Sequence, residues 1–274
     1  MATLWLRLRE GFLAPEHQTL VCDGKLPRFV LIHGFLGTPA EWQPLAGLLH
    51  AQEWSVSAPL LPGFGQHLPQ LPTVRLEQWL ASLREIVVAE QPEATILVGF
   101  SFGGALALQL AAEYSPRALV LLAPLTRLPL PRWYRWGLPI LERISDGPRP
   151  FAGLNPEDPD VRRALSGWNA ALDVGDPVIV EELRSLRFPW RILRELDRTA
   201  RAAFSAATRV RCPVWLVHAR ADQTVPVSDS RRLAARLPML QGYFEPPGDH
   251  QLVRPEHPGY WLVSQLLVRL GSER

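Results

Sequence analysis

The chain has 274 residues, of which 47% are hydrophobic and 20% are charged, and its formal net charge is +2. This length fits one large α/β domain, or one domain with an inserted subdomain, and the apolar content suffices for a core and a binding site. The small net charge and the lack of a basic run give no reason to expect a nucleic acid as partner.

The two cysteines, Cys22 and Cys212, lie inside or beside apolar runs and fit reduced, buried thiols. No cluster of cysteine and histidine has the spacing of metal ligands, so the sequence implies neither a metal nor an organic cofactor. The first ten residues include Arg7, Arg9 and Glu10 and no long apolar stretch, which argues against a signal peptide. We therefore expect a cytoplasmic protein without an integral membrane segment.

Apolar runs alternate with helical patterns along most of the chain. Residues 3–9 alternate in part and predict an edge strand, with 18–22 as its hairpin partner. Continuous apolar runs predict buried strands at 29–32, 55–60, 94–98, 118–122, 214–217 and 242–245. Helical patterns cover 40–51, 74–90, 104–112 and 260–270. This alternation indicates a mostly parallel sheet covered by helices on both faces.

The alternation stops between Thr126 and Thr208. This stretch is rich in proline, arginine and tryptophan, contains the short helical pattern 178–186, and is too long for a loop. We predict that residues 127–207 form an inserted helical cap, and that the core consists of 1–126 and 208–274.

The predicted cap contains four tryptophans, Trp133, Trp136, Trp168 and Trp190. Aromatic side chains dominate core packing as readily as they line ligand pockets, so these residues either fix the cap to the core or form an acyl pocket. We take Trp133, Trp136 and Trp168 as candidate substrate contacts.

A serine stands between two glycines directly after an apolar run, in Gly99-Phe100-Ser101-Phe102-Gly103. The preceding run predicts a buried strand, and the following run predicts a helix. Small flanking residues let the backbone bend sharply enough to expose the hydroxyl at the carboxyl edge of a sheet. This strand–turn–helix context predicts that Ser101 is a nucleophile.

A serine hydroxyl needs a base to take its proton, and the base needs a carboxylate to orient it. Asp222 comes directly after one predicted strand, and His250 comes after the last one. Ser101, Asp222 and His250 therefore follow the order nucleophile, acid, histidine, each in a loop after a strand. Asp249 and Asp229 are rival candidates for the acid.

The remaining histidines are expected to have no catalytic role. We expect His218, at the end of a predicted strand, to have a structural role. We expect His33, which precedes a glycine-rich loop after the strand at 29–32, to pack in the core rather than to react. The others are expected at the surface: His17, His50, His67 and His257.

The stretch Ile32-His33-Gly34-Phe35-Leu36-Gly37 directly follows an early strand. Its glycines allow a backbone amide to turn toward the nucleophile. The amides of Phe35 and Phe102 would then form an oxyanion hole, which stabilises the charge that develops on a carbonyl oxygen. We also expect Gly34 to contact the substrate.

Four motifs carry a family resemblance: His33-Gly34-Phe35-x-Gly37, Ala58-Pro59-x-Leu61-Pro62-Gly63-x-Gly65, Gly99-x-Ser101-x-Gly103-Gly104 and Ala219-Arg220-x-Asp222-x-x-x-Pro226. Together they resemble the α/β-hydrolase superfamily, and within it bacterial carboxylesterases and monoacylglycerol lipases. The resemblance spans nearly the whole chain outside the predicted cap. It implies an α/β-hydrolase fold with an eight-stranded, mostly parallel sheet, a mobile cap or lid, and hydrolysis of short- to medium-chain acyl esters.

On the same ground Ser101 would be the nucleophile, His250 the base and then the acid, and Asp222 its orienting partner. The enzyme would be a serine carboxylesterase whose partner is a small-molecule acyl ester and whose reaction passes through an acyl-enzyme. The sequence gives no oligomeric state.

Two relatives compete with this interpretation. Leu61–Gly65 also resembles the methyl-ester esterase of biotin synthesis, and His33–Phe35 with Glu41–Gln43 resembles the pyruvate-eliminating synthase of menaquinone synthesis. That synthase has an arginine directly after its Ser-x-Gly-Gly, where this chain has Ala105, which argues against the lyase. A non-catalytic binding protein on the same fold is a further alternative, and the complete candidate triad argues against it.

Overall fold

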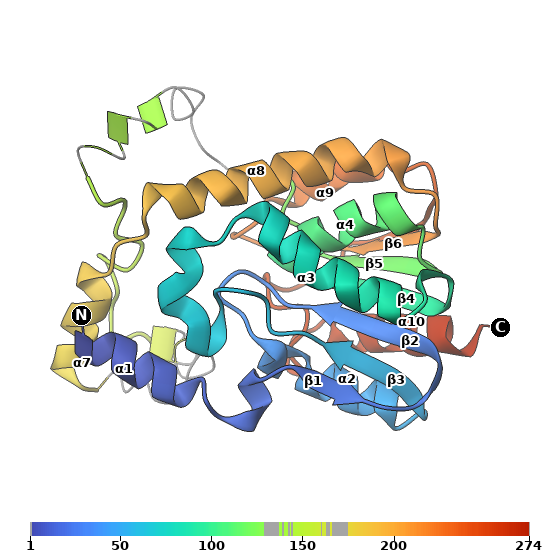
Figure 1. Cartoon of the computed structure of the whole chain (residues 1–274), viewed down its shortest axis with the longest axis horizontal. Helices are drawn as coiled ribbons and strands as arrows, with labels where there is room; N and C mark the ends of the chain where they lie inside the picture. The colour runs from blue at the N-terminus through green and yellow to red at the C-terminus, as the bar shows by residue number, and fades with distance from the viewer. Residues whose placement is uncertain are drawn as a thin grey trace.

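The computed structural model describes residues 2–128, 137–138, 140–141, 143, 145–159, 161–162, 165 and 175–273. These residues contain one seven-stranded sheet with the strand order β1-β3-β2-β4-β5-β6-β7 (Figure 1). The strands are β1 (Leu20–Cys22), β2 (Lys25–Ile32), β3 (Trp54–Ala58), β4 (Thr95–Phe100), β5 (Ala118–Leu122), β6 (Val214–Val217) and β7 (Leu240–Phe244). Only β1 is antiparallel to its neighbour. The mostly parallel sheet is confirmed, with seven described strands where the resemblance implied eight.

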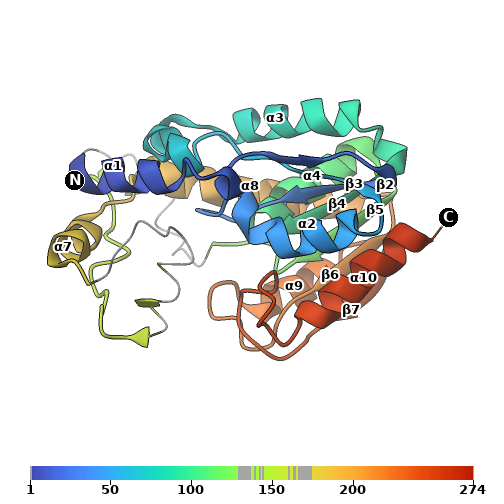
Figure 2. The same ribbon diagram turned by 90° about the horizontal axis from the view of Figure 1, so that it is seen from below.

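Helices cover both faces of the sheet, as Figure 2 shows. One face packs against α2 (Gln43–His50) and α10 (Tyr260–Ser272), and the other against α3 (Leu76–Ala89) and α4 (Phe102–Tyr114). The remaining described helices are α1 (Ala2–Gly11), α7 (Pro177–Ser185), α8 (Trp190–Ala206) and α9 (Val227–Ala234). Short 3₁₀ helices complete the described elements: η1 (Pro15–His17), η2 (Pro39–Trp42), η3 (Gly65–Thr73), η4 (Pro92–Ala94) and η5 (Ala207–Arg209).

The two faces of the sheet build two separate hydrophobic clusters. In β2, Val30 and Ile32 belong to the cluster under α3 and α4, whereas Phe29 and Leu31 belong to the cluster under α2 and α10. Successive side chains of a strand point to opposite faces, and here both faces are covered, so both sets must be apolar. This explains why the buried strands are continuous apolar runs in the sequence.

The N-terminal segment differs from its prediction, because residues 3–9 lie in helix α1 rather than in an edge strand. Leu8 and Phe12, four positions apart, are both buried in the cluster under α3 and α4. Phe12 directly follows the helix, and its amide donates to the Leu8 carbonyl at 3.0 Å. The helical hydrogen-bond pattern therefore extends to Phe12 and keeps both side chains on the same face. The predicted partner 18–22 contributes β1, which pairs antiparallel with β3 instead.

The segment between β5 and β6 contains α7 and α8 among its described residues. Helix α7 agrees with the helical pattern predicted at 178–186. Its N-cap residue Asp176 accepts a hydrogen bond from the Val178 amide at 2.9 Å and forms an ion pair with Arg7 of α1 at 3.0 Å. Ile192 and Leu196 of α8 are buried in the cluster that contains α4. Helix α7 is therefore held by α1, and helix α8 by the core.

Among the described residues, no helix combines the length and the apolar character that crossing a membrane requires.

Candidate active site

Ser101 lies in the sharp turn between β4 and α4, with φ 52° and ψ −113°. A positive φ is strained for a residue with a side chain, and such strain persists only where the surroundings hold it. Here the Ser101 amide donates to the Leu122 carbonyl at 2.8 Å, and its own carbonyl accepts from the Ala105 and Leu125 amides. Strand β5 and helix α4 therefore fix the turn that carries the hydroxyl.

The glycines beside Ser101 are required by close packing. A side chain at Gly103 would overlap the carbonyl oxygen of Ile32 in β2. A Cβ atom at Gly99 would lie 2.6 Å from the carbonyl oxygen of Gly103, which is too close for any carbon. Because neither glycine has a side chain, helix α4 can begin in direct contact with the strands. Close packing between helix and sheet therefore requires glycine at both positions of the Gly-x-Ser-x-Gly pattern.

Asp222 and His250 meet at the carboxyl edge of the sheet, in the loops after β6 and β7. His250 Nδ1 lies 2.6 Å from Asp222 Oδ2. The other carboxylate oxygen, Oδ1, accepts hydrogen bonds from the Thr224 and Val225 amides at 2.8 and 2.9 Å. A carboxylate can only accept, so Nδ1 carries the proton and Nε2 keeps a free lone pair, which is the tautomer of a general base.

A second histidine, His218, contacts the same carboxylate oxygen. Its Nε2 lies 3.0 Å from Asp222 Oδ2 and 2.9 Å from the Val225 carbonyl oxygen, and its Nδ1 lies 2.6 Å from Ser230 Oγ. Burial acts to raise the pKa of Asp222, but the hydrogen bonds from His218 and His250 outweigh it and hold that pKa well below its ordinary value. Asp222 is therefore an ionised carboxylate fixed by two histidines.

The two rival acids do not contact His250. Asp229 is 1% exposed and forms ion pairs with Arg127 and Arg232. The side chain of Asp249 is 72% exposed, and its Oδ1 accepts a hydrogen bond from the Gln251 amide. Of the three aspartates, only Asp222 is joined to His250 by a hydrogen bond.

The loop that follows β2 is held by hydrogen bonds at its base. His33 is fully buried, where its Nε2 accepts from the Leu61 amide at 3.1 Å and its Nδ1 donates to the Gly34 carbonyl at 2.9 Å. Burial lowers the pKa of His33 to about 4, so it is neutral at pH 7. The Gly34 amide donates to Glu41 Oε1 at 2.6 Å. His33 thus packs as predicted, and it shapes the loop.

The two predicted oxyanion residues are neighbours across this loop. The rings of Phe35 and Phe102 are 6.0 Å apart in an edge-to-face arrangement, and Phe35 also packs on Phe64 and Phe188. Phe102 is the first residue of α4, and the first amides of a helix have no partner within it. Phe102 directly follows Ser101 in the chain, and Phe35 contacts Phe102 through its ring. That the amides of Phe35 and Phe102 form an oxyanion hole stays a prediction.

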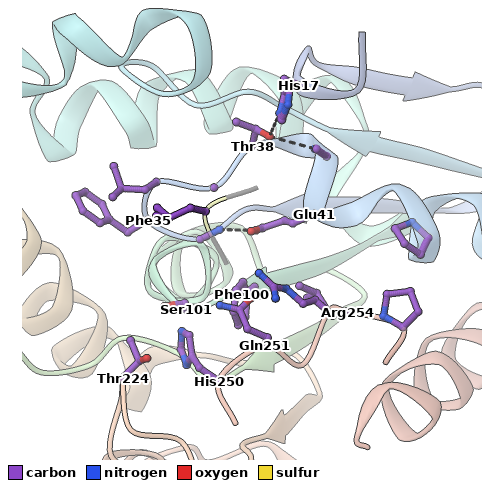
Figure 3. A pocket seen from close by; sticks show the side chains of 18 of the residues that line it. His17, Phe35, Thr38, Glu41, Phe100, Ser101, Thr224, His250, Gln251 and Arg254 are labelled. Carbon is purple, nitrogen blue, oxygen red and sulfur yellow. Dashed lines mark hydrogen bonds between the residues drawn. The ribbon is translucent and has the colours of Figure 1, made fainter. Parts of the chain in front are cut away.

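A pocket of about 600 Å³ opens around Ser101 and His250 (Figure 3). Its walls come from the loop after β2, including Gly34 and Phe35, and from the loop after β7. Phe151 and Leu165, both between β5 and β6, also line it. The predicted contacts Trp133, Trp136 and Trp168 lie outside the described residues.

One part of the pocket is polar, and none of its residues was a candidate site residue from the sequence. Glu41, Gln251 and Arg254 line it, and Figure 3 shows Arg254 pointing into the pocket between the other two. Burial raises the pKa of Glu41 to about 8, although the Gly34 amide and the charge of Arg254 both act to lower it. Only their position in the sequence could have indicated these residues, because Gln251 directly follows His250 and Arg254 comes four residues after it.

Two histidines predicted at the surface are buried instead. His17 Nδ1 lies 2.7 Å from Thr38 Oγ1, in the loop after β2. His257 Nδ1 accepts from the Gly259 amide at 2.9 Å, and its Nε2 donates to the Asp249 carbonyl at 3.0 Å. Both prediction errors have the same cause. Each histidine forms hydrogen bonds with a loop whose position cannot be derived from spacing in the sequence. Among the residues that the structure describes, no group of histidine, cysteine, aspartate and glutamate side chains could hold a metal ion.

Residues 27–245 match the model of the family described as serine aminopeptidase, S33. The chain belongs to this family of α/β-hydrolases. The match covers all of β2 except its first two residues, the strands from β3 to β7 and the loops with Ser101 and Asp222, and it ends five residues before His250. The sheet order, the turn at Ser101 and the family match therefore agree on one fold.

Known proteins extend the likeness over most of the chain. The putative carbamate hydrolase RutD of Escherichia coli K12 is 29% identical over 232 residues, which cover 82% of this chain and 84% of RutD. A monoacylglycerol lipase from Paleococcus ferrophilus superposes with a TM-score of 0.68 at 22% identity, over 93% of this chain and 99% of that one. A metagenome-derived lipolytic enzyme, from a study of LipS and LipT, superposes with a TM-score of 0.71 at 16% identity, over 94% and 99%. At these identities the two structures establish the shared fold.

Proposed function

We propose that this α/β-hydrolase is a serine carboxylesterase that cleaves short- to medium-chain acyl esters through Ser101, His250 and Asp222. The observation that carries the proposal is the 2.6 Å contact between His250 Nδ1 and Asp222 Oδ2, because it orients a histidine that lines the same pocket as Ser101 and leaves its Nε2 free to act as a base. A histidine oriented in this way is what an otherwise weak serine nucleophile needs.

The first half of the reaction transfers the acyl group to the enzyme. His250 Nε2 removes the Ser101 proton as the oxygen attacks the ester carbonyl carbon, and Asp222 stabilises the imidazolium that forms. The amides of Phe35 and Phe102 stabilise the tetrahedral oxyanion. When the C–O bond to the alcohol breaks, His250 donates its proton to the departing oxygen. The acyl group is then an ester of Ser101.

The second half repeats these steps with water in place of the alcohol. His250 removes a proton from water, whose oxygen attacks the acyl carbonyl, and the same amides stabilise the second oxyanion. Breakdown of this intermediate returns the proton to Ser101 and releases a carboxylic acid. His250 serves twice as base and twice as acid, and Asp222 remains ionised because its pKa lies far below neutrality.

The apolar lining supports an acyl chain as the group that is bound. Phe35, Phe151 and Leu165 line the pocket together, and the last two come from the segment that we propose is a cap over the core. Burial of apolar surface contributes about 0.8 kcal/mol per methylene, so efficiency should rise with chain length until the pocket is full. Trp133, Trp136 and Trp168 stay candidates for the rest of this acyl site.

The test is activity of the wild type and of Ser101→Ala on a panel of p-nitrophenyl esters, monoacylglycerols, acyl thioesters and a p-nitrophenyl carbamate. We expect the esters to be preferred. Ser101→Ala should fold normally, as judged by circular dichroism, and should lose about six orders of magnitude in turnover. A folded variant with a tenth of wild-type turnover would exclude Ser101 as the nucleophile. Preference for the carbamate would shift the assignment toward the activity in the name of RutD.

A further inference from the structure

Two donor side chains face the pocket from the loop that carries His250. Gln251 and Arg254 are both partly buried and both line the pocket. Within the described part of the chain, neither the side-chain amide of Gln251 nor the guanidinium of Arg254 has a hydrogen bond or an ion pair. An arginine presents five N–H donors in a planar fork that fits a carboxylate, so a partly buried and unpaired one offers a strong binding site for an anion.

The loop places these donors rigidly. Between them, Leu252 and Val253 are buried in the core cluster under α2 and α10. The Leu252 amide donates to the His250 carbonyl at 2.9 Å, and the Arg254 amide donates to the Gln251 carbonyl at 3.0 Å. The side chain of Arg254 is therefore attached at a fixed backbone position, four residues after the proposed base His250. A substrate group bound to it would be held at a set distance from the ester bond that reacts.

The acidic groups on the pocket do not form an ion pair with Arg254. The Glu41 carboxyl is occupied by the Gly34 amide at 2.6 Å, and its raised pKa of about 8 leaves it mostly neutral at pH 7. Glu256 also lines the pocket, but its side chain is exposed to solvent. By contrast, Arg127 and Arg232 are both paired with the buried Asp229. The positive charge of Arg254 is thus open to a ligand.

From this geometry we propose that Arg254, assisted by Gln251, binds a carboxylate on the substrate, so that the enzyme prefers esters that carry a second, anionic group. The proposal rests on the proposed esterase function and narrows its substrate class. The carboxylate could belong to the acyl part or to the alcohol part of the ester, because the same donors would bind either.

Two pairs of ester substrates test the proposal. For the alcohol part, 4-butyryloxybenzoate is compared with its methyl ester, and for the acyl part, mono-p-nitrophenyl adipate is compared with its methyl ester. In each pair the only difference is whether a carboxylate is free or esterified. We expect Arg254→Met to lower the charged-to-neutral ratio of kcat/KM by about tenfold to a hundredfold for at least one pair, as loss of a charge-assisted hydrogen bond does.

Arg209→Met is the matched control. Arg209 is exposed, bonds the Ser205 carbonyl, and lies in η5 just before β6, at the edge of the sheet opposite the pocket. Arg209→Met removes the same charge from the molecule as Arg254→Met. Because a distant surface charge is screened by salt, this control should leave the charged-to-neutral ratio of kcat/KM within about twofold of the wild type for both substrate pairs. Arg254→Lys, which keeps the charge but not the fork, should give an intermediate ratio.

A binding measurement separates this proposal from the esterase function. Isothermal titration calorimetry of the Ser101→Ala variant with 4-butyryloxybenzoate and with the adipate ester requires no hydrolysis. We expect Arg254→Met, added to Ser101→Ala, to weaken binding of at least one of them by tenfold or more. If ratios and affinities are the same with and without Arg254 for both pairs, the carboxylate site is wrong. If the wild type cleaves no ester but the affinities depend on Arg254, the esterase function is wrong and the anion site stands.

Discussion

The two ends of the pocket are built by opposite rules. At the proposed reacting end, around Ser101 and His250, Asp222 accepts hydrogen bonds from two histidines and two backbone amides. At the polar end, the donors of Gln251 and Arg254 have no partner within the described residues. Under the proposed mechanism, the side chains that would perform the chemistry are oriented by the protein in advance, whereas those proposed to bind the substrate are left for the ligand to complete.

Burial explains why the two ends can differ. Asp222 is 8% exposed, and a buried carboxylate without partners would be strongly destabilising. Arg254 keeps part of its surface in contact with solvent, so water can satisfy its donors until a ligand arrives. The three predictions below test the proposed reacting end, the apolar lining and the polar end in turn.

The largest expected effect comes from the reacting end, in Asp222→Asn. The amide cannot hold His250 in the tautomer that leaves Nε2 free, so turnover should fall by about four orders of magnitude with little change in fold. Steady-state kinetics on p-nitrophenyl butyrate, with thermal melting as a check on stability, measures this.

Asp249→Asn is the matched control, because Asp249 adjoins His250 in sequence but its side chain is exposed. Its turnover should stay within about twofold of the wild type, as expected for a surface substitution. The reverse pattern, with Asp249→Asn inactive and Asp222→Asn active, would mean that the wrong carboxylate is assigned to the triad.

A smaller effect is expected from the apolar lining, in Phe151→Ala. Removing the ring should reduce kcat/KM for a medium-chain p-nitrophenyl ester by about tenfold while changing that for acetate little, because burying an aromatic side chain contributes about 1.5–3 kcal/mol. Phe204→Ala is the control: Phe204 lies on α8 under Arg236, away from the pocket. Equal losses for acetate and the longer esters would indicate that Phe151 supports the fold rather than an acyl site.

The smallest effect concerns stability, in Glu41→Gln. The pKa of Glu41 is raised from 4.5 to about 8 in the folded protein. The contribution of the protonated carboxyl to the free energy of unfolding is therefore fully present below pH 4.5, and it is lost as the pH rises through 8. Glutamine keeps an oxygen for the Gly34 amide but cannot ionise. The variant should therefore gain about 1–2 kcal/mol over the wild type between pH 5 and pH 9, because a partly solvated carboxylate is penalised less than a fully buried one.

Urea denaturation at pH 5, 7 and 9 measures this difference. A stability gap between the two proteins that does not change with pH would show that Glu41 ionises normally in the folded state.

Much of the fold could be predicted because its signals are local. The strand at 118–122 agrees with β5 at both ends, and the strand at 214–217 agrees with β6. A strand buried on both faces must be a continuous apolar run, and this pattern is independent of its neighbours. The N-terminal helix was missed because a short run of leucines and arginines fits either period, and only the burial of Leu8 and Phe12 selects the helix.

The sequence by itself determined the order of the elements and the positions of Ser101, Asp222 and His250, because each follows a recognisable strand and parallel strands end at one edge. Tertiary structure decided which aspartate meets His250, that His218 holds the same carboxylate, and that Arg254 points into the pocket. Those facts depend on loops far apart in the chain coming together. Local periodicity places a residue on its own element, whereas its partners are set by the packing of all the others.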